Sequence, residues 1–439
     1  MNLVNQLEKI LENDNVFLSG GAGVGKSYLT NELKLAYKKA GKSVVSLGST
    51  AISAFNVGGV TLHSFFGLGL CANLDELTRF DKKQREKLAK LRKVLKSLDL
   101  LIIDEISMVS AEIFDLVAYR LRNSEFKGRI LVVGDFFQLP PVLKQEQKAK
   151  NSLFKGYYAF SSLSWADFAF KNVLLNVAKR TSNAEFYAHL SLMRKGAVSG
   201  EIIEYFRRFL IAPKQLDTLG DEFTLLCGVN KKADLINEQK LAKIDGDFII
   251  FKAQSEKYDE NLDDNAFEKW IKSLNVLDEL KLKVGAKVIF CVNNYDAGYY
   301  NGEQGEVVAV FEEDGKPYIE IEKTSGVRVK LARYTFLLED FGEDIEMRAS
   351  FSQFPIKLAY AITIHKSQGM SIERLVCDID NIFENGQLYV ALSRAVEPKN
   401  LRIFYSRAGD FGAYFANALK FDASVVEFYA KMDFVNLKE

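Results

Sequence analysis

The sequence predicts an α/β protein with two lobes, each a parallel sheet with crossover helices, and with small inserted domains. Two observations indicate this class. Short apolar runs alternate with helix-like segments toward both ends of the chain, as expected for strands buried on both faces. Between about residues 238 and 350 the pattern changes to short β-rich runs separated by Gly, Asn and Asp, which is typical of an antiparallel domain.

The length and composition of the chain limit its number of structural units and the classes of protein to which it can belong. A chain of 439 residues predicts roughly three structural units. Its content of 48% hydrophobic and 26% charged residues excludes disorder, collagen and coiled coil as descriptions of the whole chain. Basic and acidic residues balance at 58 each, so a polyanionic partner must be held by a local basic channel.

The four cysteines form no C-x-x-C pair, which argues against a zinc site or a disulfide framework. There is no secretory signal and no run of about eighteen apolar residues. We therefore expect a cytoplasmic protein in a reducing compartment, with no membrane contact. The neutral charge and the absence of heptads favour a monomer.

The first lobe is expected to cover residues 1–170. Apolar runs predict its strands at 15–19, 43–47, 98–103 and 129–133. A charged insertion is expected near 66–97. Within it, Asp75–Ser97 has Leu at helical spacing, which favours a solvated amphipathic helix, with an inserted arm as the alternative.

The second lobe is expected to combine residues 171–237 and 351–439. Its predicted strands are the runs 223–227, 375–378 and 401–405. The β-rich segment 238–350 is expected to form a small antiparallel barrel inserted between the two parts of this lobe.

The strongest local motif joins the first predicted strand to a helix. It has the form G-x-x-x-x-G-K-[ST] and consists of Gly20, Gly21, Ala22, Gly23, Val24, Gly25, Lys26 and Ser27. Glycines let backbone N–H groups surround phosphate oxygens, the lysine reaches the β and γ phosphates, and the serine hydroxyl binds Mg²⁺. The motif predicts a nucleotide site.

A second motif, LDLLIIDEIS over 98–107, ends an apolar strand in Asp104 and Glu105. Two carboxylates at the end of a buried strand are costly without a cation. We expect Asp104 to hold the Mg²⁺ shell together with Ser27, and Glu105 to polarise the attacking water.

The third motif, ILVVGDFFQLPPV over 130–142, places Gln138 just beyond another buried strand. A side-chain amide there can contact the γ-phosphate or orient water, so Gln138 is a candidate phosphate sensor. The prolines at 140 and 141 make the exit from this turn rigid.

The order of these motifs resembles superfamily I helicases of the B type. The three segments above are followed by YAITIHKSQGM over 360–370 and QLYVALSR over 387–394. The segment VGGVTLHSFFGLGL over 57–70 resembles the petite integration frequency (Pif) family in particular, and RecD and Dda helicases are the next nearest. The resemblance extends over about residues 16 to 405.

This resemblance implies an ATP-dependent DNA helicase with two RecA-like P-loop lobes, ATP and Mg²⁺ between them, and an SH3-like β-barrel in the insertion. It also implies 5′ to 3′ movement on single-stranded DNA, unwinding of tailed duplex DNA, and family-level roles in DNA repair, recombination and telomere maintenance. Unwinding of G-quadruplexes or RNA–DNA hybrids stays open.

The resemblance also implies roles for single residues. Arg180 and Arg394 resemble the two arginine fingers that reach γ-phosphate charge across a cleft, and Gly369 joins the nucleotide-contacting set. The expected nucleic-acid contacts are Ser49, Thr50, Thr61, His63, Ser64, Phe65, Pro140, Thr363, His365, Lys366 and Ser367. For Phe65, stacking on a base and packing in the core are both open.

Two other functions remain open. A single-stranded DNA translocase would displace bound proteins without efficient unwinding, and deletion of a strand-splitting pin within Asp75–Ser97 would discriminate between the two motors. A nucleotide-dependent binding switch would hydrolyse ATP at a rate that single-stranded DNA does not raise.

Overall fold

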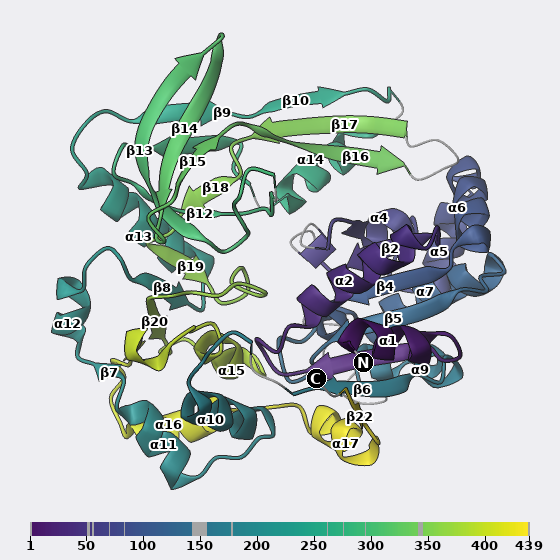
Figure 1. Ribbon diagram of the computed structural model, residues 1–439, viewed down its shortest axis with the longest axis horizontal. Coiled ribbons are helices and arrows are strands. Elements are labelled where there is room, and N and C mark those ends of the chain that lie inside the picture. Colours follow the sequence, from purple (N-terminus) through teal and green to yellow (C-terminus); the bar gives the residue numbers. More distant parts are fainter. Residues whose placement is uncertain are drawn as a thin grey trace. The chain divides into compact units, whose positions relative to one another are not determined.

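The computed structural model describes residues 2–50, 53–54, 57–69, 71–82, 84–142, 156–176, 179–260, 262–274, 276–294, 296–340 and 346–437. The chain divides into two compact units. Unit 1 comprises residues 1–180, 340–346 and 421–439, and unit 2 comprises residues 181–339 and 347–420. Each unit contains a parallel sheet (Figure 1), as the sequence predicts.

The sheet of unit 1 has seven strands in the order β22-β6-β1-β5-β4-β2-β3, and every neighbouring pair is parallel. Its strands are β1 (Val16–Gly20), β2 (Val44–Gly48), β3 (Val60–Thr61), β4 (Leu100–Asp104), β5 (Arg129–Gly134), β6 (Lys171–Leu175) and β22 (Val435–Asn436). The central strands β1 and β4 are buried along their whole length, which explains why they read as unbroken apolar runs.

Several helices of unit 1 begin where a side chain caps the first turn. Ser110 Oγ, for example, accepts a hydrogen bond from the N–H of Ile113 at 3.3 Å. The helices are α1 (Leu3–Leu11), α2 (Lys26–Lys39), α4 (Leu62–Phe65), α5 (Leu74–Asp81), α6 (Arg85–Ser97), α7 (Ala111–Asn123), α9 (Leu163–Asp167) and α17 (Ala423–Lys431), with 3₁₀ turns η1 (Ile106–Met108) and η2 (Ala159–Ser161).

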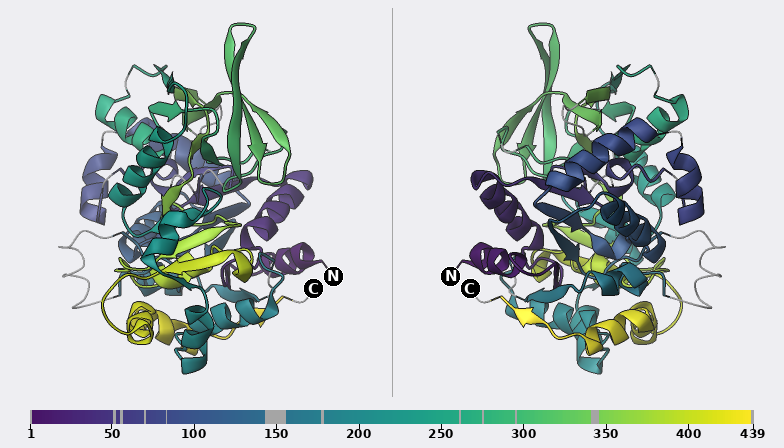
Figure 2. Two further views of the ribbon diagram at one scale, coloured as in Figure 1. Left: turned by 90° about the vertical axis from the view of Figure 1, so that its left-hand side faces the viewer. Right: turned by 90° about the vertical axis from the view of Figure 1, so that its right-hand side faces the viewer.

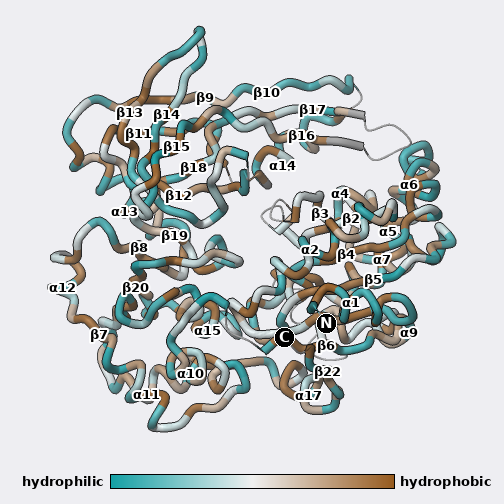
Figure 3. Tube along the Cα trace, in the orientation of Figure 1, coloured by the Kyte–Doolittle hydropathy of each residue, from teal (hydrophilic) through white to brown (hydrophobic). Residues whose placement is uncertain are grey.

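The charged segment Asp75–Ser97 forms α5 and α6. Leu77, Leu91 and Leu95 are buried in the core of unit 1, while the opposite faces are charged. Figure 3 shows the contrast between hydrophilic α6 and the hydrophobic strands β4 and β5. The leucine spacing predicts the amphipathic helical character correctly, but the segment forms two packed helices instead of one. It is not a projecting arm.

The C-terminal end of the chain differs from the expected lobe assignment. Residues 351–439 were expected in the second lobe, but residues 421–439 belong to unit 1. There β22 adds to the sheet beside β6, with Val435 paired to Val173. Strand β6 is also in unit 1, which therefore extends to Arg180 instead of ending at residue 170. Because β22 and β6 are so distant in sequence, no local pattern in either segment indicates that they pair.

The sheet of unit 2 has five parallel strands in the order β19-β8-β20-β21-β7. They are β7 (Leu210–Ile211), β8 (Thr224–Cys227), β19 (Ala361–Thr363), β20 (Leu375–Asp378) and β21 (Leu401–Phe404). The helices of unit 2 are α10 (Ala184–Arg194), α11 (Gly200–Arg207), α12 (Pro213–Thr218), α13 (Asn230–Ala242), α14 (Asp264–Ser273), α15 (Gln387–Leu392) and α16 (Phe411–Ala418), with the turn η3 (Pro398–Asn400). Among the described residues, no helix combines the length and apolar character that crossing a membrane requires.

The β-rich part of unit 2 is antiparallel. Five strands pair in the order β15-β14-β13-β12-β18, and smaller sheets join β11 to β9 and β10 to β17 and β16. These strands are β9 (Ile249–Lys252), β10 (Gln254–Lys257), β11 (Glu279–Leu282), β12 (Lys287–Phe290), β13 (Gln304–Glu313), β14 (Lys316–Lys323), β15 (Arg328–Leu331), β16 (Tyr334–Asp340), β17 (Glu346–Gln353) and β18 (Ile356–Leu358). The hairpin β13–β14 projects from its sheet (Figure 2). The SH3-like barrel stays a prediction.

Candidate nucleotide and nucleic-acid sites

The glycine-rich motif lies at the carboxyl end of β1, where α2 begins at Lys26. Gly23 and Gly25 have φ values of 75° and 88°, a region that other residues rarely adopt. A Cβ at Gly20 would lie 2.5 Å from the carbonyl oxygen of Leu175 on β6. The loop therefore requires glycine for both its conformation and its close packing, and it has the strand–loop–helix geometry that binds phosphates.

Lys26 turns back over this loop. Its Nζ donates hydrogen bonds to the carbonyl oxygens of Gly20 at 2.7 Å and Gly21 at 2.9 Å. The ammonium group is thus held at the mouth of the loop, where it can exchange a carbonyl contact for a phosphate oxygen.

Asp104 ends β4 with its side chain only 6% exposed. Burial and the nearby Glu105 raise the pKa of Asp104 to about 7, against the smaller opposing effects of the Glu105 N–H and Lys26. Glu105 has a φ of 53°, an unfavourable conformation for a residue with a side chain, and its N–H donates to Asp104 Oδ1 at 2.9 Å. Strain and a destabilised carboxylate therefore coincide at this strand end, as often seen at functional sites.

The chemistry of these groups fits a magnesium ion. A buried carboxylate whose pKa is raised gains from a nearby cation, and Mg²⁺ usually takes one or two protein oxygens together with phosphates and water. Asp104 and the Ser27 hydroxyl are the oxygens that would hold it. Within the described ranges, no group of three or more His, Cys, Asp or Glu is placed to hold a metal ion.

Gln138 follows β5 in a tight turn. Its N–H donates to the carbonyl oxygen of Asp135 at 2.9 Å, and its side chain is 5% exposed. Asp135 is fully buried and accepts the N–H of Phe137 on Oδ1 at 3.3 Å. Because β5 lies beside β1 in register, with Gly134 opposite Ser19, this turn starts next to the strand end that carries the glycine-rich loop.

Arg180 lies against the glycine-rich loop within unit 1. The N–H groups of Lys179 and Arg180 both donate to the carbonyl oxygen of Gly23, at 2.8 and 3.0 Å. A Cβ at Gly23 would lie 2.5 Å from Arg180 Cβ. Arg180 was expected in the second lobe, reaching across a cleft; instead it belongs to the same unit as the loop because the segment after β6 returns over it.

Arg394 lies in unit 2 and is only 1% exposed. Its guanidinium donates to the carbonyl oxygens of Val390, Ser367 and Met370 at 3.0 to 3.4 Å. These bonds join the end of α15 to the turn at 363–370, in which Gly369 has a φ of 80°. Arg394 therefore organises this turn.

The expected nucleic-acid contacts in unit 1 include hydroxyls that are engaged locally. Thr50 and Ser53 exchange hydrogen bonds in a turn after β2, with Thr50 N–H donating to Ser53 Oγ at 2.9 Å. Thr61 Oγ1 accepts from the N–H of Ser64 at 3.2 Å and caps α4. Ser49 lies half-buried in the same turn as Thr50.

Two expected contacts are buried. Phe65 is 4% exposed and packs edge-on against Phe66 with ring centroids 5.0 Å apart. Pro140 is buried as well. For Phe65 the core alternative is correct, since its position on α4 directs it into the apolar cluster, and neither residue presents a surface for a base. His63, on the outer side of the same helix, is exposed.

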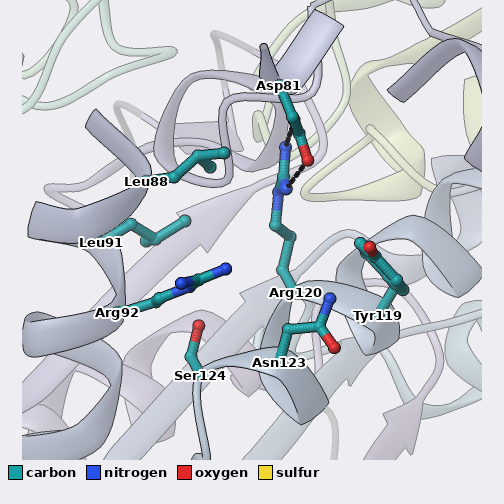
Figure 4. Close-up of a pocket in the computed structure, with 8 residues that line it drawn as sticks. All are labelled: Asp81, Leu88, Leu91, Arg92, Tyr119, Arg120, Asn123 and Ser124. Carbon is teal, nitrogen blue, oxygen red and sulfur yellow. Dashed lines mark hydrogen bonds and ion pairs between the residues drawn. The ribbon is translucent and has the colours of Figure 1, made fainter. Parts of the chain in front are cut away.

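A buried arginine fixes the segment that carries these residues. Arg120, on α7, donates to the carbonyl oxygens of Phe66 at 2.9 Å and Gly67 at 3.3 Å, and pairs with both carboxylate oxygens of Asp81 at 2.7 and 2.6 Å. Figure 4 shows this pair in a small pocket lined by Asp81, Leu88, Leu91, Arg92, Tyr119, Arg120, Asn123 and Ser124. The pair ties α5 to the turn after α4. Sequence reasoning missed it, since only contact shows that this arginine is internal.

In unit 2 the predicted contacts divide in the same way. Thr363 and Ser367 are buried, and Ser367 Oγ donates to the carbonyl oxygen of Ile364 at 2.8 Å. His365 and Lys366 are half-buried. The ring of Phe383 lies 6.3 Å from that of His365 and is 51% exposed. Sequence reasoning missed Phe383, although its exposed ring beside His365 is suited to stacking on a base.

These features together define a P-loop ATPase with a second parallel-sheet unit. A family model described as PIF1-like helicase matches residues 2–200. The chain is 55% identical to the ATP-dependent DNA helicase Pif1 of Campylobacter jejuni over 444 residues, which covers 99% of each chain. The chain therefore belongs to the PIF1-like helicase family.

Solved structures agree with this assignment. Bacteroides sp. Pif1 in complex with ADP-AlF4 is 28% identical, with a TM-score of 0.80 over 98% of this chain and 96% of the other. Bacteroides Pif1 bound to single-stranded DNA has the same identity and coverage, with a TM-score of 0.67. The likeness extends over both units, so the motifs and the fold identify the same family.

Proposed function

We propose that this chain, an ATP-dependent DNA helicase, moves 5′ to 3′ along single-stranded DNA and separates tailed duplexes. One observation carries the proposal: the glycine-rich loop, Asp104 and the Gln138 turn gather at one edge of a parallel sheet in a member of a helicase family. A relative of similar fold has been crystallised with single-stranded DNA, which supports the choice of track.

For hydrolysis we assign a distinct task to each residue. Lys26 carries positive charge to the phosphates, while Ser27 and Asp104 would hold a magnesium ion, which would supply charge neutralisation. Glu105 accepts the proton of the attacking water. Gln138 senses the γ-phosphate.

The two arginines complete the hydrolytic set in different ways. Arg180 supports the loop from its own unit, since its backbone already binds Gly23. Arg394 stabilises charge on the γ-phosphate after exchanging its carbonyl contacts for phosphate contacts. This exchange couples hydrolysis to the turn at 363–370.

For DNA, we assign contact to the exposed or half-buried groups. In unit 1 these are Ser49, Thr50, Thr61, His63 and Ser64, and in unit 2 they are His365, Lys366 and Phe383. Burial lowers the pKa of His365, which favours a neutral ring able to stack. Stacking and phosphate contacts tolerate any sequence, as a motor requires. The protein acts as a monomer in the absence of DNA.

The test measures ATPase rates with and without single-stranded DNA, beside unwinding of matched 5′-tailed and 3′-tailed duplexes. Lys26→Ala serves as the inactive control. Stimulation by DNA together with opening of only the 5′-tailed duplex is the expected result. Opening of only the 3′-tailed duplex would reverse the assigned direction.

Two other outcomes would replace the proposal. Stimulation without opening of either duplex would indicate a translocase, and a rate indifferent to DNA would indicate a binding switch. Deletion of Asp75–Ser97 is not a suitable discriminator, because Leu77, Leu91 and Leu95 belong to the core of unit 1. Substitution of Phe383, whose ring is exposed, should disturb the fold less than that deletion.

A further inference from the structure

The phenol of Tyr429, on α17, contacts two strand ends at the nucleotide edge of unit 1. Its Oη lies 2.7 Å from Ser19 Oγ, the residue just before the glycine-rich loop. It accepts the N–H of Phe136 at 3.3 Å and donates to Asp135 Oδ1 at 3.4 Å. One hydroxyl thus connects the end of β1 to the turn that follows β5.

Asp135 is the link from this hydroxyl to Gln138. The carboxylate is fully buried, so each hydrogen bond that it receives matters to its stability. Its side chain also accepts the N–H of Phe137, and its backbone carbonyl accepts the N–H of Gln138. Loss of the Tyr429 hydroxyl would weaken the hold on the carboxylate that shapes this turn.

The ring of Tyr429 is held independently of its hydroxyl. It stacks on Phe137 with centroids 4.6 Å apart and on Phe434 at 5.5 Å. The segment is further fixed by a hydrogen bond of 3.1 Å from Tyr157 Oη to Asp422 and by the pairing of β22 with β6. Removing the hydroxyl alone should therefore leave the segment docked.

We propose that Tyr429 is a positioning residue for ATP hydrolysis, acting through Asp135 on Gln138 and through Ser19 on the glycine-rich loop. The inference rests on the proposed role of Gln138. The segment that carries Tyr429 is the last part of the chain, which returns to unit 1 after α16 of unit 2. The C-terminal residues are thus part of the ATPase apparatus.

The experiment compares Tyr429→Phe with wild type in the full-length protein. The expected result is a fall of about tenfold in kcat for DNA-stimulated hydrolysis, with KM for ATP changed less than about twofold. The melting temperature should fall by only a few degrees, because one hydrogen bond is lost while the ring contacts remain. In Asp135→Asn, adding Tyr429→Phe should lower kcat by much less than about tenfold, because both changes weaken the same contact.

Tyr157→Phe is the matched control, since it removes another hydroxyl that anchors the C-terminal segment, through its hydrogen bond to Asp422. It should keep wild-type kcat. A wild-type rate in Tyr429→Phe, or an equal loss in Tyr157→Phe, would overturn the inference and reduce Tyr429 to an anchor. A wild-type protein that DNA does not stimulate would instead overturn the proposed function, and the inference with it.

Discussion

The nucleotide edge of unit 1 and the turn at 363–370 of unit 2 both carry predicted functional residues, but they hold them differently. In unit 1, Glu105 is strained and burial raises the pKa of Asp104 to about 7. In unit 2, Arg394 is buried and hydrogen-bonded to backbone carbonyls, and the Ser367 hydroxyl is bonded within its own turn.

This difference separates two ways of building a site. The unit 1 edge keeps groups in costly states that a phosphate and a cation would relieve, so it is preorganised for its ligand. The unit 2 turn satisfies its polar groups internally, so use of Arg394 in catalysis requires those bonds to be exchanged. Removing a group from the unit 1 edge should therefore lower activity without destabilising the fold, whereas removing Arg394 from unit 2 should lower activity and stability together.

Lys26→Ala should have the largest effect. Loss of the ammonium group at the loop should lower kcat for ATP hydrolysis by about 1,000-fold, with little change in melting temperature. Lys39→Ala, exposed on the same helix α2, is the matched control and should hydrolyse ATP normally. A clear fall in the melting temperature of Lys26→Ala would contradict the view that the nucleotide edge of unit 1 is preorganised for its ligand.

Arg394→Ala should lower kcat by about 100-fold and also lower the melting temperature. The guanidinium has a structural role, because it donates to three carbonyl oxygens, and a proposed catalytic role at the γ-phosphate. Calorimetry beside ATPase assays would measure both. Arg402→Ala is the control: this arginine donates to the nearby carbonyl oxygens of Lys399 and Leu401 and lies over the ring of Phe223. A fall in kcat without a fall in the melting temperature would remove the contrast between the two units.

Asp104→Asn should stabilise the metal-free protein at alkaline pH. Because the folded pKa lies above the unfolded value, the wild type loses stability as pH rises from about 4 through 7, and the amide does not. The difference in the free energy of unfolding should grow as the pH rises from about 4 through 7 and vanish below about pH 4. Urea unfolding across pH measures it, with exposed Asp75→Asn as control.

Phe383→Ala should have the smallest effect, about a fivefold loss of affinity for single-stranded DNA. The ring is half exposed, so its removal should not disturb the fold, and ATPase without DNA should be unchanged. Fluorescence anisotropy with a labelled oligonucleotide measures the affinity. Phe248→Ala removes an equally exposed ring elsewhere in unit 2 and should bind DNA normally; equal losses in both variants would argue against a specific stacking site.

The sequence predicted most strands closely. The run at 375–378 coincides with β20, and the glycine-rich motif lies between β1 and α2 as expected. Such agreement is local in origin, since buried parallel strands are apolar throughout and a phosphate loop needs glycine at fixed positions. The helical character of α5 and α6 is local in origin as well, because leucines at helical spacing predict it.

The sequence by itself determined the α/β class, the order of motifs and the residues able to bind phosphate, because these depend on side-chain chemistry at short spacing. Only the tertiary structure decided that Phe65 and Pro140 are buried, that Arg180 shares a unit with the loop, and that Tyr429 reaches Asp135. Each of these depends on which distant segments pack together. A contact between residues nearly 300 positions apart, such as Tyr429 with Asp135, produces no periodic pattern in the sequence. Its energy arises only when the chain has folded.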